Sequence, residues 1–277
     1  MSEKASNNAL EVVITNALRI PGVKVNRREF LIKTFDNHLS NLQIQDLIEK
    51  GPVLAGIKLS TIEREAKNLI NKRTLQSSGA SFAAGLPGGF AMAATIPADT
   101  LQFFGVVLRM AQELAYIYGF KDLWENGNLD DKNVIQELVV FIGVMFGVGG
   151  SATALRLISV NMSKQALKKI PQKALTNTIY YPIIKKIAAV LGVKLTKDTF
   201  AKGVSKAIPI IGGIISGGMT YASMKPMGER LRKVLDKSVT NYSQADYDRD
   251  VAEVASDITR DFVEVDYEVI EEDNIGR

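Results

Sequence analysis

Polar side chains follow one side of a long helical pattern in the middle of the chain. At about 100° per residue, six of them fall within an arc of about 140°. The stripe has two interpretations: the solvated face of an amphipathic helix capped by Asp99, or a polar groove in which Arg109 contacts the anionic group of a small ligand. The residues that would bind such a ligand are Asp99, Gln102, Arg109 and Glu113, with Gln112 and Tyr116 on the same arc.

The spacing within this stripe argues against acid–base catalysis. Asp99 and Glu113 lie 14 residues apart in one helical pattern, which corresponds to about 21 Å along the axis. Two carboxylates at that distance do not act on one bond. Arg109 and Glu113, one helical turn apart, are expected to form an ion pair. No catalytic residue is predicted.

Metal and cofactor chemistry have little support in the composition. The chain of 277 residues has no cysteine and one histidine, His38, so thiolate zinc sites and multi-histidine sites are excluded. Gly147–Ala152 matches G-x-G-x-x-A, but the region that follows is lysine-rich and no strands are expected, which disfavours a dinucleotide. The GLPGG motif lacks the lysine of a phosphate loop. We predict no cofactor and no metal.

Helical periodicity dominates the chain, and it predicts an all-α fold. We expect a single helical domain over residues 1–240, followed by an acidic tail over residues 241–277 that is partly helical or flexible. The predicted helices include Ser6–Arg19, Arg27–Leu39, Thr61–Ser77, Thr100–Tyr118, Thr196–Ile208, Met227–Val239 and Asp246–Val263.

Small residues recur in three Gly/Ala-rich apolar segments, GLPGGFAMA, GVMFGVGGSATA and GGIISGGMTYA. Such residues allow helix backbones to approach closely in soluble cores and in membranes alike. The residues expected to have this structural role are Gly85, Pro87, Gly88, Gly89, Gly212, Gly213, Gly217 and Gly218.

A membrane-embedded helical hairpin is an alternative for these segments. Leu138–Leu155 holds 18 residues without a charge, close to the about 20 that a span needs. Its glycines make it only mildly apolar, and Asp99 beside the first segment would cost about 3 kcal/mol at bilayer depth. We therefore favour buried helices. The N-terminus lacks the pattern of a secretory signal, so cytoplasmic residence is expected.

Charge is strongly segregated along the chain. Residues 241–277 contain 12 acidic and three basic residues, a net charge of −9, whereas the preceding 240 residues carry +13. The stretch Arg156–Lys206 has 11 bases and one acid. Lysines contribute about 1 kcal/mol each beside an anionic leaflet, and Tyr180 and Tyr181 suit its interface. The candidate membrane-surface residues are Lys168, Lys169, Lys173, Lys185, Lys186 and Lys194.

This basic stretch predicts a partner of opposite charge. The preferred interpretation is peripheral association with anionic lipid, or with a membrane protein complex, at the inner face of the membrane. The plain alternative is a solvated face, partly neutralised by the acidic tail, which is expected to compete for it. Because the stretch uses lysine almost exclusively, whereas base readout recruits arginine, nucleic acid is disfavoured.

Five motifs together resemble the EcsC protein family: KVNRREFL (Lys24–Leu31), AGLPGGFAM (Ala84–Met92), IPAD (Ile96–Asp99), AYIYGF (Ala115–Phe120) and IPIIGGIISGGMTYASM (Ile208–Met224). The likeness covers about Leu10–Leu235 and leaves the acidic tail outside. It implies a bacterial, largely helical domain whose founding relatives are associated with an ABC-type exporter, and it implies no catalytic role. It places Gly85, Pro87, Gly88, Asp99, Tyr118 and Gly119 in a shared core. Without a Walker motif or clear permease spans, this chain is not expected to be the transporter itself.

Overall fold

The computed structural model describes residues 3–36, 41–77, 98–125, 132–159, 187 and 217–256. Several predictions fall outside these residues. They concern His38, the predicted helix Thr196–Ile208, the glycines and the proline expected to allow close packing (Gly85, Pro87, Gly88, Gly89, Gly212, Gly213) and the candidate membrane-surface lysines (Lys168, Lys169, Lys173, Lys185, Lys186, Lys194).

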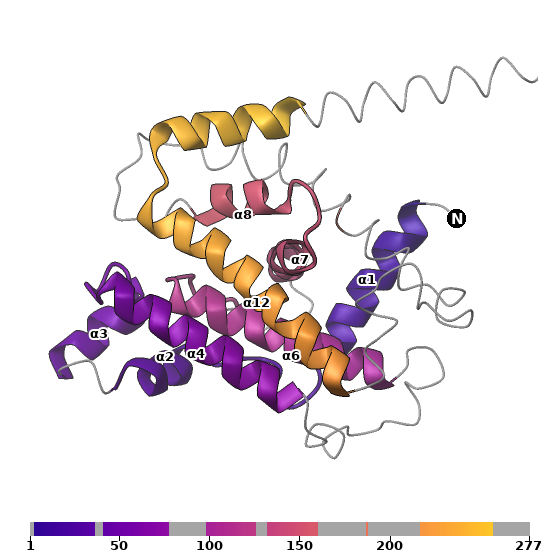
Figure 1. The fold of residues 1–277 in the computed structure, drawn as a ribbon, viewed down its shortest axis with the longest axis horizontal. Coiled ribbons are helices and arrows are strands. Elements are labelled where there is room, and N and C mark those ends of the chain that lie inside the picture. Colours follow the sequence, from indigo (N-terminus) through magenta and orange to yellow (C-terminus); the bar gives the residue numbers. More distant parts are fainter. Residues whose placement is uncertain are drawn as a thin grey trace, which may run out of the picture.

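Within the described ranges all regular structure is helical, which confirms the all-α prediction (Figure 1). Gly217 and Gly218 form the start of the long helix α12. An additional helix spans residues 244–256. The labelled helices are α1 (Glu3–Leu18), α2 (Arg27–Phe35), α3 (Asn41–Lys50), α4 (Leu59–Ser77), α6 (Ala98–Ile117), α7 (Lys132–Phe146), α8 (Ser151–Ser159) and α12 (Gly217–Thr240).

Helix α6 is the centre of the bundle. It contacts α1, α2, α4, α7 and α12, and these helices surround it in Figure 1. Its apolar residues recur every three or four positions, as a buried helix requires, and the predicted apolar face is fully or almost fully buried. That face comprises Leu101, Phe104, Leu108, Ala111, Leu114, Ala115 and Tyr118.

The uncharged run Leu138–Leu155 does not form one helix. Helix α7 ends at Phe146, and Gly147 takes a left-handed φ of +71°. The amide of Val148 bonds the carbonyl of Gly143 at 2.9 Å, the six-to-one bond of a Schellman turn. Helix α8 then starts at Ser151 in a new direction. Among the described helices, none combines the length and apolarity needed to cross a membrane.

Helix α12 is longer than its charged part suggests. The expected helix Met227–Val239 extends back to Gly217 and passes through Pro226. Its Gly228 allows a close crossing, because a Cβ there would lie 3.0 Å from Ile70 of α4 and 3.1 Å from the sulfur of Met110 of α6. Close approach therefore brings the three longest helices together at one point.

A buried arginine joins the ends of two helices to the start of a third. Arg27, at the start of α2, donates from Nε to the carbonyl of Phe120 at 2.7 Å and from Nη1 to that of Ile48 at 2.5 Å. A cation at helix C-termini satisfies carbonyls that lack partners within the helix. Burial lowers the pKa of its guanidinium. Gly51 and Gly119, both with positive φ, approach each other beside this arginine.

Replacing Gly51 by alanine tests this junction. At Gly51 (φ +81°) a Cβ would lie 2.9 Å from the Cα of Gly119, whereas at Gly56 (φ +86°) it would meet nothing within 4 Å. We expect Gly56→Ala to cost about 1 kcal/mol from backbone strain alone and Gly51→Ala to cost at least ~2 kcal/mol. Urea unfolding measures both. Equal losses of stability in the two variants would show that the close approach of Gly51 to Gly119 does not constrain the fold.

Candidate functional site

The polar stripe on α6 is largely buried, which corrects the expectation of a solvated face. Gln112 and Tyr116 are fully buried and Glu113 is 1% exposed. Gln102 is half-buried, and the side chain of Arg109 is 31% exposed. Asp99 lies in the first turn of α6, at the helix start that was predicted for it. Buried polar groups need partners, and here they come both from nearby residues and from distant parts of the chain.

Glu113 is held by two arginines. Arg73 of α4 donates from Nε to one carboxylate oxygen at 2.6 Å and from Nη2 to the other. Arg109 donates from Nε at 3.1 Å, which confirms the expected ion pair one turn apart. Arg109 also donates from Nη1 to the carbonyl of Gly22 at 2.6 Å. The carboxylate thereby fixes α4 and the turn at residues 19–25 onto α6.

Gln112 makes a second connection to the same turn. Its side-chain nitrogen donates to the carbonyls of Val23 and Leu108, both at 3.0 Å. Its oxygen accepts from the amide of Val25 at 3.2 Å and from the indole of Trp124 at 2.8 Å. All of its usual bonding capacity is therefore used inside the protein.

Tyr116 extends this network toward the end of α6. Its hydroxyl donates to Asp122 at 3.4 Å and accepts from the amide of Leu123 at 3.3 Å. Burial, followed by the nearby charge of Asp122, raises the pKa of this hydroxyl well above its usual range. Tyr116 is thus a neutral structural group. Beside it, the ammonium of Lys24 lies 4.9 Å from the centre of the Trp124 ring, within range of a cation–π interaction.

These contacts concern the polar groove that was one interpretation of the stripe on α6. The structure brings Arg109 and Glu113 together, but their described partners are protein groups: the side chain of Arg73 bonds Glu113, and the backbone carbonyl of Gly22 bonds Arg109. Arg73 was missed because it lies 40 residues before Glu113 in another helix. The position of Arg73 in the sequence pattern of α4 does not indicate that it binds Glu113. Ligand binding by Asp99, Gln102, Arg109 and Glu113 remains a prediction.

Neutralising Glu113 tests the importance of the α6 network. Glu113→Gln leaves two arginines facing an uncharged amide in a buried position, so we expect the free energy of unfolding to fall by about 3 kcal/mol. Glu49→Gln, at an exposed position of α3, removes the same charge and is expected to change it by less than about 0.5 kcal/mol. Denaturant titration compares them. Similar small losses would contradict a stabilising role for the bonds of Arg73 and Arg109 to Glu113.

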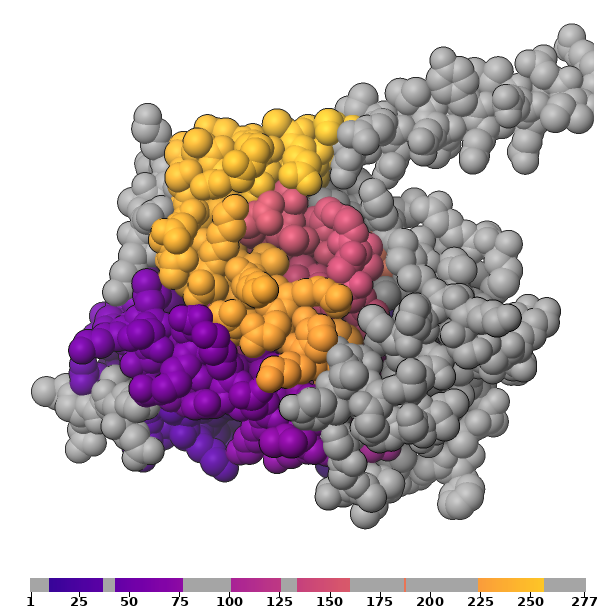
Figure 2. All heavy atoms as spheres, viewed as in Figure 1, coloured from indigo at the N-terminus to yellow at the C-terminus, as the bar shows by residue number. Residues whose placement is uncertain are grey.

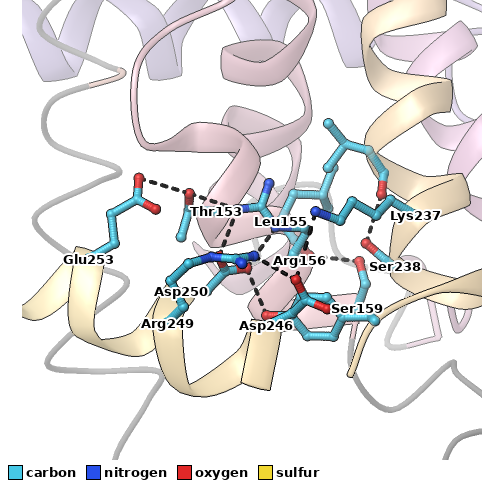
Figure 3. A network of polar contacts seen from close by, with 12 residues as sticks. Thr153, Leu155, Arg156, Ser159, Lys237, Ser238, Asp246, Arg249, Asp250 and Glu253 are labelled. Atoms are coloured by element: carbon cyan, nitrogen blue, oxygen red, sulfur yellow. Dashed lines mark hydrogen bonds and ion pairs between the residues drawn. The ribbon is translucent and has the colours of Figure 1, made fainter. Parts of the chain in front are cut away.

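A second buried ion pair lies where the last helix meets α8 (Figure 3). Arg156 donates from Nε to one oxygen of Asp250 at 2.6 Å and from Nη2 to the other at 2.8 Å. This bidentate geometry is the strongest that a guanidinium and a carboxylate form. Asp250 is fully buried, and the Arg156 side chain is 14% exposed. The bonds to Asp250 raise the pKa of the guanidinium.

Further contacts surround this pair. The hydroxyl of Tyr242 donates to Asp250 at 2.8 Å, and Thr153 bonds both Arg156 at 3.1 Å and Glu253 at 3.2 Å. Tyr242 and Tyr247 form a small apolar cluster that packs against Leu157. We call the whole contact the clasp; its residues are Thr153, Arg156, Leu157, Tyr242, Tyr247, Asp250 and Glu253.

The clasp attaches part of the predicted tail to the body. In the space-filling view the last helix, in yellow, lies over α8, in pink (Figure 2). Val254 of this helix is 1% exposed and belongs to the main core. The amphipathic pattern predicted from Asp246 is helical over its described part, residues 244–256. Charge segregation gave the only sequence signal for the clasp, since Arg156 begins the basic stretch and Asp250 lies in the acidic one.

The last helix begins with a capping box. The amide of Asp246 donates to the hydroxyl of Ser243 at 3.2 Å, and the carboxylate of Asp246 accepts from the amide of Ser243 at 3.1 Å. This reciprocal pair satisfies free amides of the first turn. The bonds from Ser243, followed by that from Arg249, hold the pKa of the Asp246 carboxyl well below its ordinary value of 3.8.

The lowered pKa of Asp246 predicts how the stability of the protein depends on pH. Because the folded-state pKa lies below the unfolded value, the cap stabilises the protein above pH 3.8 and the contribution is lost as the pH falls below it. Asp246→Asn removes the titrating group. The stability difference between wild type and Asp246→Asn should therefore be largest at neutral pH and vanish in strong acid, as measured by urea unfolding over a pH series. A difference independent of pH would contradict this cap.

We compared the chain with protein-family models, with curated proteins and with solved structures, and none of the three comparisons gave a match.

Proposed function

We propose that this chain is an EcsC-like, non-catalytic protein that associates with anionic membrane lipid, directly or within an exporter-linked membrane complex, at the inner face of the membrane. The association would use the lysine-rich stretch Arg156–Lys206. The observation that carries the proposal is the charge of this stretch, 11 bases against one acid. Such a density of lysine is what an anionic leaflet attracts.

The position of the stretch in the fold supports the proposal. It begins within α8, a helix that packs on α7 and α12 at the side of the bundle and carries the clasp. Its first base, Arg156, already holds a carboxylate in bidentate geometry. The same guanidinium geometry suits a phosphate oxygen pair.

The ion pairs of α6 give no comparable support for a ligand site. Glu113, Arg109 and Arg73 satisfy one another, and Gln112 is fully bonded within the protein. Their described role is to hold α4 and the turn after α1 against α6.

Vesicle flotation tests the proposal. The full chain should float with vesicles of phosphatidylcholine and phosphatidylglycerol in equal amounts, and not with phosphatidylcholine alone. Replacing Lys168, Lys169, Lys185 and Lys186 by glutamine should weaken the partition on the order of a hundredfold or more, at about 1 kcal/mol for each lysine. Added salt should weaken it further.

A matched control separates local from total charge. Lys33, Lys58, Lys72 and Lys233 are exposed on the described body, and their replacement by glutamine lowers the net charge equally. This control should float like wild type. Equal loss in the two variants, or no flotation of wild type with either vesicle, would overturn the proposal.

A further inference from the structure

We propose that the clasp is releasable: Asp250 binds Arg156, and the helix at residues 244–256 holds its acidic residues beside the start of the lysine-rich stretch until an anionic membrane displaces them. This inference rests on the proposed membrane association and adds its regulation. It comes from the juxtaposition of Arg156, Asp250 and Tyr242.

Residues of α8 and of the segment after α12 both contribute bonds to the contact. Asp250 receives two bonds from Arg156 and one from Tyr242, and the nearest other cation, Arg249, lies 3.9 Å from it. The hydroxyl of Tyr242 adds a bond to Asp250, and the hydroxyl of Thr153 accepts one from Arg156. Figure 3 shows Thr153 beside Arg156. A carboxylate in this place satisfies a guanidinium that would otherwise be free to bind another oxyanion.

The helix at residues 244–256 is also suited to detach. The last helix follows α12 after a three-residue connection at 241–243, and its own aromatic cluster is separate from the main core. Val254 is its described apolar anchor in that core. Segments with few buried apolar contacts open at a lower free energy than the global fold. By contrast, α6 is surrounded by five helices.

The charges of the last helix and of the lysine-rich stretch determine that an anionic membrane favours release of the helix. Residues 244–256 hold four acids and one base, and they lie against a helix that ends at Ser159, five residues before Lys164. On an anionic surface these acids are repelled while the lysines are attracted. A membrane that binds the lysines therefore favours the released state, and its differential affinity is what shifts the equilibrium.

Two asparagine variants of the same helix test the clasp. Asp250→Asn removes the buried charge that binds Arg156. Asp248→Asn makes the same change in net charge at an exposed position bonded to Gln244. Hydrogen exchange of residues 244–256 in the free, full chain should speed up by about 10- to 100-fold in Asp250→Asn, because a hydrogen bond to a charged group stabilises the closed state by that factor. In Asp248→Asn the exchange rate should stay near that of wild type. The amides of α6 serve as the internal reference for global folding.

Tyr242→Phe provides a milder variant if Asp250→Asn unfolds the chain. It keeps the ring in the apolar cluster and removes one bond to Asp250, so it should speed exchange in residues 244–256 by a smaller factor. Unchanged exchange in both variants would overturn the clasp.

Flotation on phosphatidylcholine–phosphatidylglycerol vesicles tests the regulation. Asp250→Asn should partition roughly tenfold more strongly than wild type, and Asp248→Asn should gain much less. Equal gains would show that only total charge matters and would overturn the gating role. If no form floats, the proposed membrane association fails and the gating role fails with it, while exchange still decides whether the clasp itself holds the helix.

Discussion

Glu113 is the buried carboxylate on which the arrangement of this bundle depends. A charge that is 1% exposed must be paired, and its partners come from α4 and from its own helix. Arg109 passes the constraint on to the turn after α1 through Gly22. Gln112 binds the same turn at Val23 and Val25, so α1, α2 and α4 are held in one register on α6. These directional bonds add to the register that apolar packing sets between the helices.

The two buried ion-pair networks lie in different parts of the fold and hold different segments. The Glu113 network lies at the most enclosed helix of the fold and holds segments that are also joined by extensive apolar packing. The Arg156–Asp250 pair lies at the side of the bundle and holds one helix with a small apolar cluster of its own. Loss of the first would disorganise the core. Loss of the second would free a charged helix and leave the central packing of α4, α6 and α12 in place.

Local patterns in the sequence predicted the helices but not the contacts between them. The apolar period of α6 predicted a helix over Thr100–Tyr118, close to the observed Ala98–Ile117, and Gly119 after it takes a positive φ of +99°. The break at Gly147 was not foreseen, because an uncharged run reads as continuous until a left-handed glycine ends it. Gln112, Glu113 and Tyr116 looked solvated since each is polar. Two of the decisive partners, Arg73 for Glu113 and Val23 for Gln112, lie 40 and 89 residues away. The opposite charges of the basic stretch and the tail did anticipate a contact, though only the structure assigns it to Arg156 and Asp250.

The last helix is held on α8 in the free protein, and we propose that it leaves α8 on an anionic membrane. The absence of cysteine allows two spin labels to be placed cleanly, at Lys233→Cys on α12 and Ala252→Cys on the last helix, both exposed. Electron spin resonance should give one narrow distance distribution for the free chain, and a longer, broader one on vesicles of phosphatidylcholine and phosphatidylglycerol. A distribution that stays narrow and unchanged while the protein is bound to those vesicles would show that the last helix stays on α8, contrary to the proposed release.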